Sequence, residues 1–136
     1  MENNSNLTKI YIVRHGETEA NAARVVSGHF DSPLTSIGEE QAESRRESLK
    51  HINFDAVFSS DLVRAKRTAE IIAVDRKLAV NTTRLIRERC FGRWEGRPIS
   101  EVVEESKKML AWRETLTEEG KRASKMNFGY ESDNDI

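Results

Sequence analysis

A histidine followed by glycine and preceded by arginine is the feature of this sequence most able to do chemistry. His15 lies between Arg14 and Gly16, directly after the apolar run at residues 9–13. A neutral imidazole can attack phosphorus and form a phosphohistidine, which divides one difficult displacement into two easier ones. An adjacent arginine suits that reaction, because its planar guanidinium binds two phosphate oxygens at once. An isolated histidine is more often a surface or core residue, but these neighbours favour the catalytic interpretation.

A second arginine and a carboxylic acid could complete such a site. Arg64 follows a second apolar run at residues 54–60, so it could converge with Arg14 on one phosphate. A leaving alcohol needs a proton, which a carboxylic acid can supply. Glu88 precedes a glycine-bearing loop and is the candidate donor. The alternative for Glu88 is an ion pair with a neighbouring arginine, and sequence spacing alone favours that ion pair.

The hydrophobic pattern predicts three strands that would position these residues. Four consecutive apolar residues within 9–13 predict a strand that is buried on both faces. Residues 54–60 predict a second buried strand, and the weak alternation at 78–83 predicts an edge strand. Parallel sheets place ligands at the carboxyl ends of their strands. The residues that follow the first two strands are therefore expected to meet.

Helix-forming residues separate the strands, at residues 36–50, 61–73 and from about residue 100 onward. Ser36 with Glu39 fits a capping box for the first helix. Ser60 or Asp61 is the expected N-cap of the second helix, and Ser100 that of the third. The alternation of strands and helices predicts an α/β layered sheet.

Composition predicts one domain and excludes several classes of protein. The 136 residues contain 37% hydrophobic and 33% charged residues, with a formal net charge of −1. That balance calls for neither a nucleic-acid partner nor a membrane partner, and no apolar run approaches the length of a bilayer span. Cys90 is the only cysteine, which excludes an internal disulfide and fits a reducing, cytoplasmic environment. The polar residues 1–8 are expected to form a flexible tail.

Four ordered segments of the chain resemble the signatures of the histidine phosphatase superfamily, the phosphoglycerate mutase-like proteins. Asn21 and the pair Ser27-Gly28 add to the resemblance, which spans about residues 9–132. The segments are IVRHGET at 12–18, PLTxxGxxQA at 33–42, SSDLxRAxxTA at 59–69 and RExxFGxWEG at 87–96.

The resemblance implies a fold and a role for each matching residue. It implies a three-layer α/β/α sandwich with a mostly parallel sheet, and no metal ion or organic cofactor. His15 would be the nucleophile of phosphomonoester hydrolysis and Glu88 the proton donor. The phosphate of a small phosphorylated substrate would be bound by Arg14 and Arg64, and the rest of the substrate by Asn21, Ser27 and Gly28.

One departure from the family concerns phosphoglycerate mutases. Those members carry a lysine shortly after the conserved glutamate and an arginine pair further on, whereas this chain has Ile99 and no such pair. Phosphate hydrolysis is therefore favoured over mutase-type phosphoryl transfer, which is the alternative. In this family, the residues that determine the substrate usually lie in a variable helical insertion, which is expected here at about residues 100–127.

The other departure concerns the C-terminal part of the family's domain. The family has a second catalytic histidine on a later strand that lies between the first two strands found here, but this chain's other histidines are His29 and His51. Residues 129–132 resemble the stretch that leads to that strand. We therefore expect residues 9–136 to form an incomplete domain with impaired activity, and open sheet edges that favour self-association. A non-catalytic phosphate-binding module or an inactive fragment is the alternative.

Overall fold

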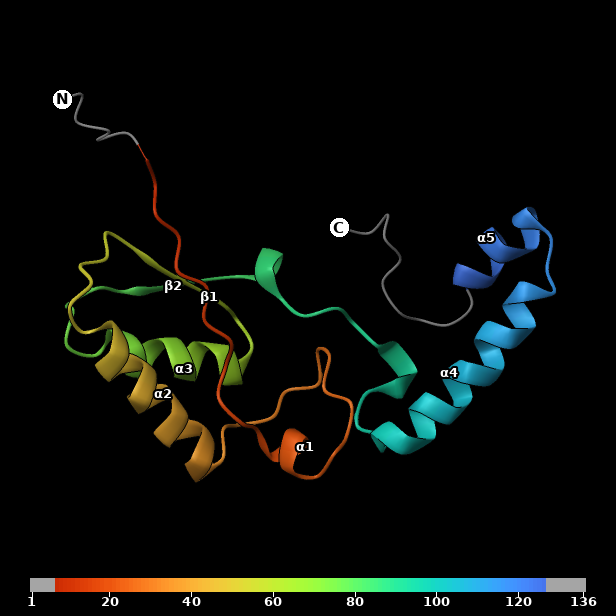
Figure 1. The fold of residues 1–136 in the computed structure, drawn as a ribbon, viewed down its shortest axis with the longest axis horizontal. Coiled ribbons are helices and arrows are strands. Elements are labelled where there is room, and N and C mark those ends of the chain that lie inside the picture. The colour runs from red at the N-terminus through yellow and green to blue at the C-terminus, as the bar shows by residue number, and fades with distance from the viewer. Residues whose placement is uncertain (1–6, 127–136) are drawn as a thin grey trace.

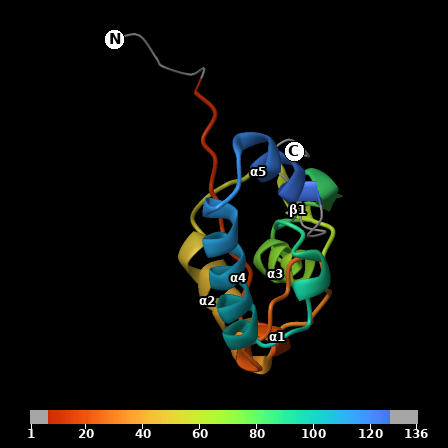
Figure 2. The same ribbon diagram turned by 90° about the vertical axis from the view of Figure 1, so that its right-hand side faces the viewer.

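The computed structural model describes residues 7–126 and is drawn in Figure 1, with a second view in Figure 2. Most of the tail predicted at residues 1–8 lies outside the described residues, as do residues 129–132. Among residues 7–126, no helix has the length and apolar character needed to cross a bilayer.

The sheet has two parallel strands, β1 (Val57–Ser60) and β2 (Val80–Thr83), which pair in register from Val57 with Val80 to Ser60 with Thr83. The helix α3 (Val63–Ala73) connects the strands and packs on both, and α2 (Ser36–Leu49) packs against α3. The two helices therefore lie along one side of the strands (Figure 1). The predicted α/β class and the parallel pairing are confirmed.

The apolar run at residues 9–13 is extended but is not a buried strand, so that prediction is wrong. The exposed fractions of Ile10 and Ile12 are 79% and 93%, and no strand pairs with this segment within the described part of the chain. Figure 2 shows the start of the segment running upward away from the helices. A strand needs a neighbour for its backbone groups, and apolar composition cannot supply one. Tyr11 and Phe54 make an edge-to-face ring contact at 5.5 Å between centroids.

The second apolar run forms a shorter strand than predicted. Of residues 54–60, only β1 is a strand, and its side chains differ in burial. Ser59 and Ser60 are buried, whereas Phe58 is 66% exposed. The edge of β1 opposite β2 has no strand beside it among residues 7–126.

Three predicted N-caps are wrong. The hydroxyl of Thr35, not Ser36, caps α2 by accepting the N–H of Gly38 at 3.0 Å. The N-cap of α3 is Leu62, whose side chain makes no capping hydrogen bond. Asp61 is not the cap, because its carboxylate accepts both Nε and Nη2 of Arg87 at 2.6 Å. The third helix likewise begins after Pro98 and not after Ser100.

The segment predicted as a helical insertion contains α4 (Ile99–Glu114) and α5 (Glu118–Met126), which contact each other. In Figure 1 this pair lies at the opposite end of the molecule from α2 and α3. The remaining short elements are α1 (Glu19–Ala22) and two 3-10 helices, Arg84–Ile86 and Gly92–Trp94.

Candidate functional site

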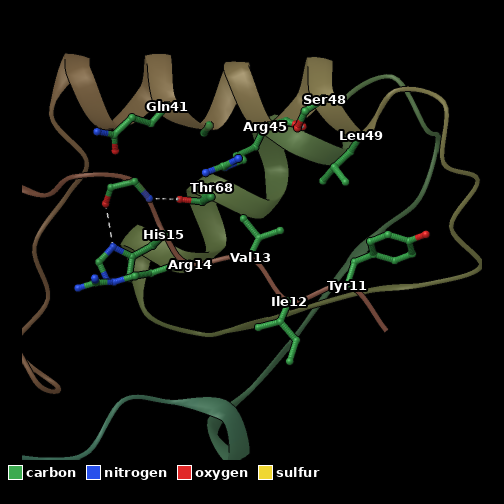
Figure 3. A pocket seen from close by; sticks show the side chains of 12 residues that line it. Tyr11, Ile12, Val13, Arg14, His15, Gln41, Arg45, Ser48, Leu49 and Thr68 are labelled. Carbon is green, nitrogen blue, oxygen red and sulfur yellow. Dashed lines mark hydrogen bonds between the residues drawn. The ribbon is translucent and has the colours of Figure 1, made fainter. Parts of the chain in front are cut away.

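His15 is half-buried at the end of the extended segment, beside a cleft of about 630 Å³. Residues 11–16 form one wall of this cleft, and side chains of α2 with Thr68 of α3 form the other. Val13 points toward these helices and Ile12 points away from them (Figure 3). The segment thus places His15 at the end of the cleft.

A hydrogen bond to the backbone fixes the proton of the His15 ring. Nδ1 of His15 lies 2.7 Å from the carbonyl oxygen of Gly16, the bond drawn in Figure 3. A carbonyl oxygen can only accept, so Nδ1 must carry the hydrogen. In the neutral ring, Nε2 then holds an unprotonated lone pair, which is the form that a nucleophile needs.

The surroundings of His15 keep its ring neutral. Burial lowers the pKa of His15 most, and the charges of Arg64 and Arg14 lower it further. The bond to Gly16 and the charge of Glu88 oppose this, but the net pKa is below the ordinary value. The neutral form therefore persists to lower pH than in an exposed histidine.

Two facing glycines hold the turn after His15 against α2. A Cβ on Gly16 would collide with the carbonyl of Gly38, and a Cβ on Gly38 would collide with the carbonyl of Glu17. The N–H of Gly16 also donates to Thr68 Oγ1 at 3.2 Å. Only glycine at both positions permits this close approach.

We expect Gly38→Ala to destabilise the chain by about 2–3 kcal/mol, because the new methyl meets backbone that cannot rotate away. Urea unfolding followed by circular dichroism measures this free energy. Gly120→Ala is the matched control, since Gly120 also lies in a helix but its Cβ would be 3.3 Å from the nearest atom, Leu116 Cβ. The control should change stability by less than about 1 kcal/mol. Equal losses in both variants would contradict the close-approach argument.

Arg64 is held by backbone carbonyls and is only 2% exposed. Its Nη2 donates to the carbonyl of Gly28 at 2.7 Å and its Nη1 to that of Phe30 at 3.2 Å. Arg64 and Thr68 lie one turn apart on the buried face of α3, and Thr68 Oγ1 donates to the Arg64 carbonyl at 2.8 Å. The helix thus presents Arg64 and Thr68 on the same side, toward His15.

Glu88 lies near the same charges. Burial lowers the pKa of both His15 and Arg64 most, and the negative charge of Glu88 opposes that shift in each, which indicates that Glu88 lies near both. Its Oε1 accepts the N–H of Arg89 at 2.8 Å. The neighbouring arginines make other pairs, Arg87 with Asp61 and Arg93 with Glu105.

The three predicted substrate contacts lie outside the walls of the cleft. Asn21 is exposed and forms a reciprocal cap with Thr18, through its Oδ1 and its N–H at 3.1 Å each. Ser27 closes a tight turn, since its carbonyl accepts the N–H of Phe30 at 2.7 Å. Gly28 is buried, with φ of +51°, and its carbonyl binds Arg64. In the described structure, Asn21 therefore stabilises the start of α1, and Gly28 holds the Arg64 guanidinium in place.

Sequence reasoning assigned no role to Thr68, Gln41 or Glu95, which hold the loops of the site together. Gln41 Oε1 accepts the N–H of Glu17 at 2.9 Å, and Glu95 Oε1 accepts two backbone N–H groups. All three residues fall within the family motifs, and that position was the only sequence feature that could have pointed to them. Within residues 7–126, no group of three His, Cys, Asp or Glu side chains is arranged to hold a metal ion.

Comparison with known proteins gives the family. An adenosylcobalamin/α-ribazole phosphatase of Escherichia coli K12 is 38% identical over 105 residues, or 76% of this chain and 52% of that protein. A protein of Salmonella choleraesuis named "Probable phosphoglycerate mutase GpmB" is 41% identical over 110 residues, or 81% of this chain and 50% of its own.

Among solved structures, a mycobacterial glucosyl-3-phosphoglycerate phosphatase in complex with VO3 has a TM-score of 0.66 and 31% identity, and the match covers 78% of this chain and 54% of that one. The chain spans about half the length of the curated relatives it matches. Residues 10–128 match the model of the histidine phosphatase superfamily (branch 1), and the chain belongs to this family.

Proposed function

We propose that this chain carries the phosphoryl-transfer site of a phosphomonoester hydrolase, with His15 as the nucleophile. The observation that carries the proposal is the Nδ1 bond of His15 to the Gly16 carbonyl, which leaves the Nε2 lone pair available. The lowered pKa of His15 supports it, because the ring stays neutral to lower pH than that of an exposed histidine.

The proposed reaction has two steps. In the first, Nε2 of His15 attacks phosphorus, the bond from phosphorus to the ester oxygen breaks, and Glu88 gives its proton to the departing alcohol. In the second, Glu88 takes a proton from water, the water oxygen attacks phosphorus, and the bond to Nε2 breaks to release phosphate. The positive charges of Arg14 and Arg64 stabilise the charge that spreads over the phosphoryl oxygens.

A small phosphorylated molecule is the proposed substrate class. Two of the relatives are named as phosphatases, one of α-ribazole and one of glucosyl-3-phosphoglycerate, and the latter was solved with VO3. Hydrolysis is favoured over mutase-type transfer because Ile99 stands in place of the mutase lysine, although the Salmonella relative is named as a mutase. The single Cys90 fits a cytoplasmic site of action.

A non-catalytic phosphate-binding module is the second candidate. The observation that favours it is the absence of a second site histidine, since the chain has only three histidines. His51 is exposed, and the ring of His29 lies 2.7 Å from the carbonyl of Glu88. A site with its cations and no second histidine could bind a phosphate ester without turning it over.

Hydrolysis of an aryl phosphate at pH 5.5 and 7 tests the two candidates. We expect Glu88→Gln to lower the rate by about 100-fold or more, because the leaving group loses its acid. Glu104→Gln, an exposed glutamate of α4, is the control and should keep the full rate. Phosphate-ester binding without turnover by the unaltered chain would favour the binding module. A folded chain with neither binding nor turnover would contradict both candidates.

A further inference from the structure

The carboxylate of Glu95 holds together two loops that are far apart in the sequence. Its Oε1 accepts the backbone N–H groups of His29 and Phe91, both at 2.9 Å. Burial raises the pKa of Glu95, but hydrogen bonds from the backbones of His29, Phe91 and Phe30 and from the Cys90 side chain together outweigh it, and the net pKa lies below the ordinary value. Glu95 is therefore ionised near neutral pH and makes charge-assisted bonds, which are about twice as strong as neutral ones.

The loop that Glu95 binds, residues 28–30, carries the contacts of Arg64. The carbonyls of Gly28 and Phe30 accept the two terminal nitrogens of the Arg64 guanidinium at 2.7 and 3.2 Å. The same loop reaches Glu88, since Nε2 of His29 lies 2.7 Å from the Glu88 carbonyl. Three consecutive residues thus connect Glu95 with the Arg64 guanidinium and with the backbone of Glu88, which are two of the four residues proposed to act in the reaction.

Glu95 and the segment around it lie close to this loop. Gly28 has φ of +51°, and a Cβ there would collide with Oε1 of Glu95. The backbone beside Glu95 is tied to the start of the loop, because the N–H of Gly96 donates to the Val26 carbonyl at 2.8 Å and the N–H of Val26 to the Arg97 carbonyl at 2.9 Å. The carboxylate cannot shift without moving the loop.

We infer that Glu95 is a positioning residue of this site, which sets the Arg64 guanidinium and the Glu88 backbone by holding residues 28–30. The inference rests on the proposed function for its meaning in catalysis, but the positioning itself can be measured separately. Glu95 has no proposed contact with the phosphate, and its negative charge also interacts directly with the Arg64 guanidinium. Its effect on phosphate binding is therefore expected to depend mainly on Arg64.

Side-chain NMR of Arg64 in the phosphate-free chain is the first measurement. In Glu95→Ala, the Arg64 Nε–H signal should lose its restricted mobility, and in Glu95→Gln, which keeps the Oε1 acceptor without the charge, the loss should be smaller. Glu105→Ala is the matched control, because Glu105 also binds two groups, Arg93 and Arg97, each at 2.7 Å. The control should leave the Arg64 signal unchanged. An unchanged signal in a folded Glu95→Ala variant would overturn the inference, whatever the chain does with phosphate.

Binding of inorganic phosphate by titration calorimetry is the second measurement. We expect Glu95→Ala to weaken binding by about 10-fold, and to weaken it no further when Arg64→Ala is already present, because acting through a shared partner is non-additive. Additive losses in the double variant would overturn the inference. If Glu95→Ala frees Arg64 while the unaltered chain binds no phosphate, the positioning stands and the proposed function fails.

Discussion

Replacing His15 by alanine is expected to abolish the covalent phosphorylation of this chain. When the unaltered chain is mixed with an aryl phosphate labelled at phosphorus and quenched with base, label should stay on the protein. The bond would be a phosphoramidate on Nε2, so brief acid treatment should release it. His15→Ala should carry no detectable label and should hydrolyse the ester at least about 1,000-fold more slowly, as expected for loss of a nucleophile.

His51→Ala is the matched control for this experiment. His51 is exposed, follows α2 and is not part of the cleft wall, so its removal should leave the label intact. Label that survives acid, or that persists in His15→Ala, would place the phosphate on another residue. A folded chain that takes up no label would show that Arg14, Arg64 and Glu88 do not suffice without the second histidine of the family.

The candidate site residues could be named from the sequence because their signals are local. Arg14, His15 and Gly16 are consecutive, and Arg64 follows its strand within a few residues. The family resemblance then implied a shared role for positions far apart in the chain. Burial and hydrogen bonding at His15 add the tautomer and the direction of its pKa shift, which no motif encodes.

The hydrogen bonds that Glu95 accepts from the backbone could not be predicted, although Glu95 lies within a motif. Its partners are backbone N–H groups, and one of them belongs to His29, 66 residues earlier in the chain. Every non-proline residue has such a group, so the sequence carries no sign of which one is bound. The N-caps failed for a related reason, because Asp61 is a good cap by type but Arg87 binds its carboxylate instead.

The strand prediction at residues 9–13 is wrong because a strand forms only beside another strand, and the pattern of one segment does not show whether such a neighbour is present. The pattern predicted a strand buried on both faces, and such burial requires strands and helices on both sides. Within residues 7–126 the helices cover one side only, and Val13, which points toward them, is less exposed than Ile12. The matched 105 residues are 76% of this chain but 52% of the Escherichia coli relative, so that relative is about one and a half times as long as this chain.

We propose that this uncovered segment makes the chain self-associate and that Ile12→Lys prevents it. Ile12 is 93% exposed and Ile10 is 79% exposed. Among residues 7–126, no strand pairs with this segment or with the edge of β1 opposite β2, so both are open to pairing with a second copy. Burying one isoleucine contributes about 1.5–3 kcal/mol, and a symmetric dimer would bury two. Ile12→Lys should therefore raise the dimer dissociation constant by at least about 100-fold, measured by sedimentation at several protein concentrations.

Leu85→Lys distinguishes pairing through this segment from nonspecific association through exposed apolar side chains. Leu85 is 91% exposed, nearly as much as Ile12, but it lies in the 3-10 helix Arg84–Ile86 and not on an extended segment. Its replacement removes a similar apolar area and adds the same charge, yet it should leave the dissociation constant within about threefold, because no strand edge is altered. Equal effects of the two substitutions would assign the association to exposed apolar area alone. A chain that stays monomeric at every concentration would show that residues 9–13 do not pair with a second copy.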